Sequence, residues 1–529
     1  MLLFGVLNAV LYAGLTPLWE GFDEPFHYAY VQQLWKTWSL PVQKGTSLPE
    51  EVWQSFPLAP ASHVVQRNLP MVTTFDDYFQ LGEPERQARR RQLEQLDPNL
   101  ARIDSSCPNY ESQQAPLAYA VLAPINALWG RTPLPGRVWR LRLVCALLSC
   151  LATGLLVFRM AELLALPEIF RLTAVFLVFA SQMFYVTTAH IANDWLAIPL
   201  FLLLLHAGVT LYLTPRPTAV WVLALTLAAG LLTKAYFLAM LPFAFGIVMW
   251  CCLRRRLAWR LGGLFAVVSL APSAPWYIRN LRLYHDLSGQ QETIGGTPVR
   301  ALLDAAIHLP WGRSLGATAR TSLWEGNSSA TTFGATTIGL MLALLGAAAC
   351  LYVRGAFRAR PPGSELVLLS GAGCFALGLA YSTVLLFYST KGAGITPAPW
   401  YVQVLEPPGL CLLLTGMARS GRAGHWLRLG ILWLWAYVIA ATYVAKLIPL
   451  YGGYGGRPVR LIELLRWYRG GFREIGGILS TTAMISPAAL WLLTAMVVTI
   501  AVALAARLST ENKETEVSSA TGGAGLNGV

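Results

Sequence analysis

Charge is scarce in this sequence. Only 13% of its 529 residues are Asp, Glu, Lys or Arg, whereas 55% are hydrophobic. Soluble domains carry roughly 25% charged residues, so this deficit excludes an ordinary soluble protein. The net charge is +13, yet no compact basic patch with interleaved aromatic residues occurs, so nucleic acid is not expected as a partner. An anionic lipid surface or a phosphate-bearing substrate is the favoured partner instead.

Disulfides, zinc-site spacings and internal repeats are also missing. Seven of the eight cysteines lie in or beside apolar runs, where a free cysteine behaves as a small apolar residue, and Cys107 alone lies in a polar segment. No disulfide framework can be drawn, and no Cys and His spacing typical of zinc occurs. The lack of a long repeat argues against a transporter assembled from inverted halves.

Apolar runs, by contrast, recur from one end of the chain to the other. Their lengths are near the ~20 residues that cross a bilayer, and about twelve of them are expected to be spans. The first run lacks a basic leader and a small-residue cleavage site, so it is expected to be a retained span. The sequence therefore predicts an all-α, polytopic membrane helix bundle over residues 1–506. The runs lie roughly at 1–19, 138–158, 170–190, 195–213, 219–237, 238–253, 261–278, 332–353, 365–389, 400–418, 428–449 and 486–506.

Arginines on the short connections indicate the orientation. They fall on every second connection, and the positive-inside rule makes those connections cytoplasmic. Both termini are then cytoplasmic, and the protein is expected in the cytoplasmic (inner) membrane. The alternation requires that 116–130 be a juxtamembrane helix and not a span. The marker residues are Arg159, Arg171, Arg216, Arg254, Arg255, Arg256, Arg260, Arg354, Arg358, Arg360, Arg419 and Arg422.

This orientation gathers three long polar segments, 20–137, 279–331 and 450–485, on the outer, periplasmic face. The first contains many prolines and an arginine cluster at 86–91. It is expected to be the first extracytoplasmic loop, folded into amphipathic helices that lie on the membrane. Residues 507–529 are polar and end in Gly and Ser, so they predict a disordered cytoplasmic tail.

The most informative polar motif is Asp23-Glu24-Pro25-Phe26-His27, directly after the first run. Adjacent carboxylates and an imidazole are poor anchors at a membrane face, where Trp, Tyr, Lys and Arg usually serve. They can exchange a proton or an ion with a polar substrate, which makes them catalytic candidates. A solvated acidic loop is the alternative. His27 shares a helical face with Glu24, and both ligation and a structural hydrogen bond are open to it.

Further polar residues lie at span ends on the same expected face. Asn193-Asp194 opens the fourth span, where Asp194 could be a helix cap or could converge with Asp23 on one cavity. Lys234 and Arg279 end the fifth and seventh spans. Each could simply reach toward the interface, or the two could hold a lipid-linked phosphate, Arg with two prongs and Lys as a point charge.

The order of these motifs is itself a pattern. An apolar span is followed by Asp-Glu-x-x-His, a loop ending in Ala115-Pro116-Leu117-Ala118-Tyr119, then Asn-Asp, Leu-Thr-Lys and Trp-Tyr-x-Arg-Asn. Over most of 1–290 this order resembles the GT-C superfamily of bacterial membrane glycosyltransferases, relatives of protein O-mannosyltransferases and of the lipid A aminoarabinose transferases. Two departures stand out. Ala115 replaces a usual proline, and the late Arg-Tyr-x-x-Pro motif appears as Trp400-Tyr401 followed by Pro407.

The resemblance implies an enzyme of the cell envelope that takes a hexose or pentose from a polyprenyl-phosphate donor. Its acceptor would be an extracytoplasmic glycan, lipid or protein, and membrane lipids would surround it. The implied catalytic residues are Asp23, Glu24 and Asp194. The implied substrate and donor contacts are His27, Asn193, Lys234, Arg279 and Tyr401.

An inverting displacement needs one base and no acid, because a phosphate leaves without protonation, and Asp23 is the predicted base. Glu24 would orient the acceptor. Alternatively, the three carboxylates Asp23, Glu24 and Asp194 would hold a divalent cation, Mg²⁺ or Mn²⁺, which prefer oxygen ligands. Two other functions stay open: a catalytically silent GT-C-like subunit of a membrane complex, and a lipid or solute transporter.

Overall fold

The structure is a computed structural model that describes residues 1–529 except 70, 99–106, 291–296, 330, 455–459 and 523–529. Helices provide almost all of the regular structure in the described residues. The sheet found there is a pair of two-residue parallel strands, β1 (Pro60–Ala61) and β2 (Thr73–Thr74). The predicted all-α polytopic fold is confirmed.

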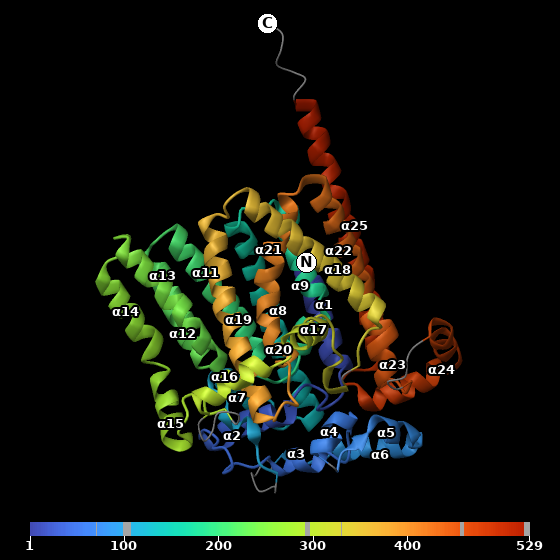
Figure 1. Cartoon of the computed structure of the whole chain (residues 1–529). Coiled ribbons are helices and arrows are strands. Elements are labelled where there is room, and N and C mark those ends of the chain that lie inside the picture. The colour runs from blue at the N-terminus through green and yellow to red at the C-terminus, as the bar shows by residue number, and fades with distance from the viewer. Residues whose placement is uncertain (70, 99–106, 291–296, 330, 455–459, 523–529) are drawn as a thin grey trace.

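Upright helices form the bundle (Figure 1). In the described residues, seven are long and apolar enough to cross a membrane, or up to nine if each of two bent pairs is one span. Helices α1, α12 and α21 are shorter than the ~20 residues of a full span, so the count of about twelve stays a prediction. The helices of the bundle are α1 (Leu2–Leu15), α8 (Leu134–Leu163), α9 (Glu168–Ala180), α10 (Gln182–Thr188), α11 (Asp194–Leu213), α12 (Pro217–Leu231), α13 (Leu241–Leu253), α14 (Trp259–Leu270), α15 (Ala274–Tyr284), α18 (Ala335–Arg358), α19 (Gly363–Ser389), α21 (Glu406–Ala418), α22 (Gly421–Ala441), α23 (Ile448–Tyr451) and α25 (Pro487–Gly522), with the short turns η3 (Ala235–Met240), η5 (Gln403–Leu405) and η6 (Thr442–Leu447).

Two predicted spans are bent where straight helices were expected. The 170–190 run bends by 60° between α9 and α10, where the backbone of Ser181 is extended. The 261–278 run bends by 50° between α14 and α15, next to Pro272 and Pro275, which lack the N–H that would continue a helix. The short helix α10 ends at Thr188 and leads directly into the residues of the candidate site.

The described residues of 16–133 form a layer across one end of the bundle, which we name the cap; that end of the molecule is the cap side (Figure 1). The predicted juxtamembrane helices are present there. Helix α7 covers the 116–130 segment, and it begins and ends on the cap side, as expected of a helix that does not cross. The helices of the cap are α2 (Glu24–Thr37), α3 (Glu50–Ser55), α4 (His63–Asn68), α5 (Phe75–Gln80), α6 (Glu83–Glu94), η2 (Tyr110–Gln113) and α7 (Leu117–Leu128).

Local sequence signals explain where the first helices stop and start. Helix α1 ends at Leu15 because Pro17 follows almost at once and cannot extend a helix. Helix α2 then begins with Glu24 and Pro25, an acidic residue and a proline in the first turn, where both are favoured. The turn between these helices, 16–23, brings the acidic motif to the boundary between the bundle and the cap.

The other described cap-side helices come from the later connections. They are α16 (Val299–His308), α17 (Trp311–Thr321), η4 (Asn327–Ser329), α20 (Pro399–Val402) and α24 (Leu461–Thr482). Helices from the three long polar segments, 20–137, 279–331 and 450–485, therefore lie on the cap side. This is the grouping that the sequence predicts for these segments.

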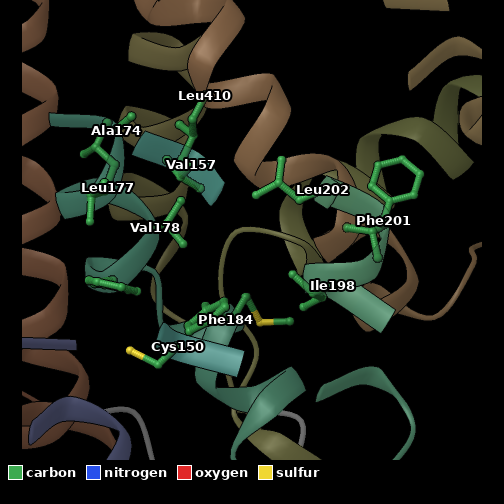
Figure 2. Packing of buried hydrophobic residues seen from close by; sticks show 14 of the residues in the cluster. Cys150, Val157, Ala174, Leu177, Val178, Phe184, Ile198, Phe201, Leu202 and Leu410 are labelled. Carbon is green, nitrogen blue, oxygen red and sulfur yellow. The ribbon is translucent and has the colours of Figure 1, made fainter. Parts of the chain in front are cut away.

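Buried apolar side chains join the upright helices. Figure 2 shows Val157 of α8, Val178 of α9 and Leu410 of α21 gathered between their helices, with Phe201 of α11 nearby. Lipid tails are as apolar as these residues, so close van der Waals packing holds them together, and exclusion of water contributes little. This rigid packing fixes the helix ends that carry the site.

The chain's first residue and the far end of α25 lie on the side away from the cap (Figure 1). That this side faces the cytoplasm stays a prediction. The disordered tail at 507–529 also stays a prediction: the backbone of α25 extends to Gly522, and residues 523–529 lie outside the described residues.

Candidate active site

Asp23 lies in the tight turn between α1 and α2. Its backbone is left-handed, with φ of 56°, a conformation that Asp and Asn tolerate better than most residues. Two residues earlier, a Cβ on Gly21 would come within 2.6 Å of the Cβ of His190. Only glycine lets the turn approach the α10–α11 connection this closely. The turn is thereby pressed against the segment that carries Asn193 and Asp194.

The Asp23 carboxylate accepts a hydrogen bond from the Tyr110 hydroxyl. Burial raises the pKa of Asp23. The Tyr110 hydrogen bond and the positive charge of Lys234 lower it, and the negative charge of Asp194 raises it again. Asp23, Lys234 and Asp194 therefore act on one another electrostatically, so the structure brings together the two acidic elements and the lysine that sequence analysis expected on one face.

A cavity of about 650 Å³ opens beside Asp23. Asp23 and Tyr110 line one part of it, and Glu325, from the segment before α18, also lines it. Burial raises the pKa of Glu325. Aromatic rings form much of the remaining wall: Phe22 stacks on Trp400 with ring centroids 4.2 Å apart. The cavity thus combines acids with flat apolar surfaces, a lining suited to a polar ring such as a sugar.

Lys234 and Asp194 form a buried ion pair. The Nζ of Lys234 lies 2.6 Å from each oxygen of Asp194, and both side chains are almost fully buried. The ammonium also lies over the ring of Tyr401, 4.5 Å from its centroid. Lys234 therefore points into the protein and not along the lipid interface. Asn193, and not Asp194, takes the N-cap position of α11, and it makes no side-chain capping bond.

Glu111 was missed by sequence analysis, although it lies at the centre of this cluster. It is buried, and its pKa is raised to about 8 by burial and by the negative charge of Asp23, while a Gln114 hydrogen bond and Lys234 lower it. His27 lies 3.8 Å from Glu111, and its Nδ1 is 2.7 Å from the Tyr119 hydroxyl. A lone acid in the single short turn η2 carries no periodic signal, so only its position just before the Pro-Leu-x-Tyr helix could have indicated it.

Glu24 points away from Asp23 into the bundle. Its two oxygens receive the Nε of Arg142, at 2.7 Å, and an Nη of the same guanidinium, and one oxygen also accepts from the backbone N–H of Ile191 at 3.1 Å. Arg142 in turn donates to the carbonyls of Thr16 and Pro17. Both side chains of this pair are fully buried, and the pair connects the α1–α2 turn to helix α8. The sequence does indicate that Arg142 is paired, because a charged residue inside an apolar helix requires a buried partner.

The remaining predicted residues lie at different distances from the cluster. Asn193 donates to Gln114 at 2.9 Å and to the Thr233 carbonyl at 3.2 Å, which links the two loops that carry Asp194 and Lys234. Arg279 instead donates to the Pro41 carbonyl at 2.6 Å and lies over the Trp276 ring. The contacts of Arg279 are therefore with Pro41 and Trp276, whereas Lys234 contacts the acid Asp194, so only the lysine of the predicted clamp is bound to an acid.

The predicted metal ligands do not fit a divalent cation. Both Glu24 oxygens are bound by Arg142, and both Asp194 oxygens by Lys234. No group of three or more His, Cys, Asp or Glu side chains in the described part of the chain could hold a metal ion. A cation at Asp23, Glu24 and Asp194 would have to displace two buried basic groups first.

Glu20 is a further buried acid, and its hydrogen bonds stabilise the wall of the cavity. One of its oxygens accepts hydrogen bonds from the Ser329 backbone N–H, at 2.9 Å, and from the Ser329 and Tyr451 hydroxyls. Burial raises the pKa of Glu20 and these hydrogen bonds lower it in part, which leaves the pKa at about 8. Asn327 joins Tyr451 and Tyr12 in the same network. The turn that carries Asp23 and the segment that carries Glu325 are therefore fixed relative to each other.

A solved structure resembles this chain over most of its length. It is the crystal structure of ArnT from Cupriavidus metallidurans bound to undecaprenyl phosphate, with a TM-score of 0.40 and 14% identity, covering 87% of this chain and 76% of that one. No family model matches the chain, and no curated protein sequence matches it. The fold described above rests on the chain's own helices, and the function proposed below rests on its own residues.

Proposed function

We propose that this chain is a membrane glycosyltransferase that moves a sugar from a polyprenyl-phosphate donor to an acceptor bound on the cap side. One observation carries the proposal. Asp23, the acid predicted to be the base, lies in a rigid turn, receives a hydrogen bond from Tyr110, lies within the field of Lys234 and lines a cavity of about 650 Å³. This is the arrangement that a base needs beside a bound polar substrate at a membrane boundary.

In the proposed reaction the acceptor hydroxyl attacks the anomeric carbon of the sugar. The hydroxyl proton passes to Asp23, a carbon–oxygen bond to the acceptor forms, and the bond to the donor phosphate breaks. The polyprenyl phosphate leaves with the bonding electron pair and needs no proton. One base and a single displacement invert the anomeric centre.

Lys234 has two proposed roles. Its positive charge already lowers the pKa of Asp23, which keeps more of the base ionised. An ammonium has three N–H donors, and the Asp194 oxygens account for two of them. In the proposed reaction the third is donated to the donor phosphate, whose charge builds up as the sugar departs. Asp194 holds the lysine in place, and Tyr401 and Asn193 support that pair.

Glu325 takes the acceptor-orienting role that the sequence suggested for Glu24. It lines the same cavity as Asp23, whereas Glu24 is fully engaged with Arg142. We propose that Glu24 is a positioning residue that fixes the Asp23 turn through Arg142. His27 and Glu111 are a buried polar pair near Asp23, and Arg279 contacts the donor at the edge of the site.

Turnover of a polyprenyl-phosphate-linked sugar by the full-length protein in liposomes tests the proposal. Lys234→Ala should weaken donor capture and also reduce turnover, because the donor phosphate is charged before and during the reaction. The control is Lys391→Ala, which removes the same group from an exposed turn. If Lys234→Ala has wild-type kinetics, Lys234 does not bind the donor phosphate. Wild-type protein that binds no lipid-linked sugar would favour the silent-subunit or transporter alternatives.

The pH profile offers a second test. The ionised Asp23 is the active form, and its pKa is raised, so turnover should fall as the pH drops through a value above that of an ordinary aspartate. Tyr110→Phe removes a hydrogen bond that favours the ionised form, which raises the pKa further. The acidic limb of the profile should therefore move to higher pH in Tyr110→Phe, with little loss at its plateau. An unmoved limb would show that Tyr110 does not tune the base. The control is Tyr381→Phe, on an exposed ring of α19.

A further inference from the structure

Helix α24 joins two upright helices on the cap side. Helix α23 ends at Tyr451 and α25 begins at Pro487, so α24, at Leu461–Thr482, stays close to the membrane boundary. In Figure 1 it lies beside α23 and the cap helices α5 and α6. Phe472 of α24 stacks on Trp491, near the start of α25, with centroids 5.0 Å apart. Aromatic residues at the end of a span mark the interface with the headgroups.

One face of α24 packs on the protein. Leu464, Ile475 and Leu479 are buried. The Tyr468 hydroxyl donates to the Val444 carbonyl at 2.7 Å, and Ser480 lies 3.2 Å from the side chain of Gln87 on α6. The helix is therefore held in a fixed rotation about its axis, so its other face is presented in one direction.

That other face carries two adjacent stripes. The apolar stripe consists of Leu461, Ile462, Leu465 and Phe472, each between 57% and 70% exposed. The arginine stripe consists of Arg466, Arg469 and Arg473, whose spacing of three and four residues places them side by side on a helix. All three are exposed, and none has a hydrogen-bond or ion-pair partner among the described residues, whereas Arg89 and Arg90 of α6 pair with Glu85 and Glu94.

We propose that α24 is an interfacial helix that binds anionic phospholipid in the leaflet on the cap side. The apolar stripe enters the acyl chains, and the arginine stripe lies at the depth of the phosphates. This pairing of an apolar face with adjacent cations is what a helix needs to lie in a charged interface. Arginine suits the role because its planar fork grips phosphate with two hydrogen bonds.

The test uses full-length protein in lipid nanodiscs that hold one copy each. Hydrogen exchange is measured for peptides covering 461–482, in phosphatidylcholine discs and in discs containing phosphatidylglycerol. Each arginine near an anionic surface contributes roughly fivefold in binding, so exchange should slow by at least about fivefold when phosphatidylglycerol is present. Added salt should reverse the slowing, because it screens exposed charges.

The triple variant Arg466→Gln, Arg469→Gln, Arg473→Gln should lose the dependence on phosphatidylglycerol while exchange in α8 is unchanged. The matched control is Arg254→Gln, Arg255→Gln, Arg260→Gln. It removes the same charge from the side away from the cap and should keep the dependence on phosphatidylglycerol. Equal exchange in both lipids would overturn the proposal. So would protection by inorganic phosphate in phosphatidylcholine discs, or protection seen only in discs that hold two copies, which would assign the face to self-association.

Discussion

Asp23→Asn should lower sugar-transfer turnover by at least ~100-fold while expression and donor binding stay nearly unchanged. The amide keeps the volume of the side chain and removes only the basic oxygen. Asparagine also tolerates the left-handed backbone of this position, so the turn should survive the substitution. The measurement is turnover at saturating polyprenyl-phosphate sugar in liposomes.

The matched control is Asp76→Asn, the same chemical change at a cap aspartate whose side chain is 66% exposed. It should retain wild-type turnover. Two results would reject the assignment of the base. If Asp23→Asn is fully active and a folded Glu24→Gln is inactive, Asp23 is not the base. If both are active, the motif is not catalytic, and the silent-subunit alternative replaces the enzyme.

Arg142→Met should destabilise the protein by about 3–5 kcal/mol, because it leaves the buried Glu24 carboxylate without its partner. The thermal unfolding midpoint of the detergent-solubilised protein should fall, and less protein should accumulate in the membrane. The double variant Arg142→Met, Glu24→Gln should recover part of the loss, since no buried charge then remains unpaired.

An exposed ion pair supplies the comparison. Arg159 pairs with Glu162 at 2.8 Å on the side away from the cap, and both side chains are about half exposed. Arg159→Met should leave the midpoint unchanged within error, because exposed pairs contribute little. A normal midpoint for Arg142→Met would show that the α1–α2 turn is held by other contacts, and the positioning role of Glu24 would be lost with it.

Long apolar runs made the bundle predictable, because the length of an apolar run and its hydrophobic period can be read from a single sequence. The placing of Asp23, Asp194 and Lys234 on one face followed from the order of the spans, since alternate span ends share a face. Topology does not specify the direction in which a side chain points. Glu24 is adjacent to Asp23, yet it points into the bundle toward Arg142.

Loop residues were harder still. Glu111 lies in the short turn η2 and Glu325 in an irregular segment, and nothing in their spacing distinguishes them from solvated acids. The bends at Ser181 and beside Pro272 were also missed, because an apolar window averages over a break in the backbone. Arg279 failed to join the lysine for a related reason: two span ends on one face can still be far enough apart to serve different neighbours.

The Glu20 network has a consequence for biogenesis. Glu20 and Tyr451 are 431 positions apart in the chain. At synthesis rates of ~5–20 residues per second, Tyr451 leaves the ribosome roughly 20–90 s after Glu20. Until Ser329, and later Tyr451, has been made, the nascent turn lacks the partners that bury its acid. The turn that carries Asp23 should therefore remain loosely held at the membrane surface during insertion, and the cavity should close only when the penultimate upright segment is in place.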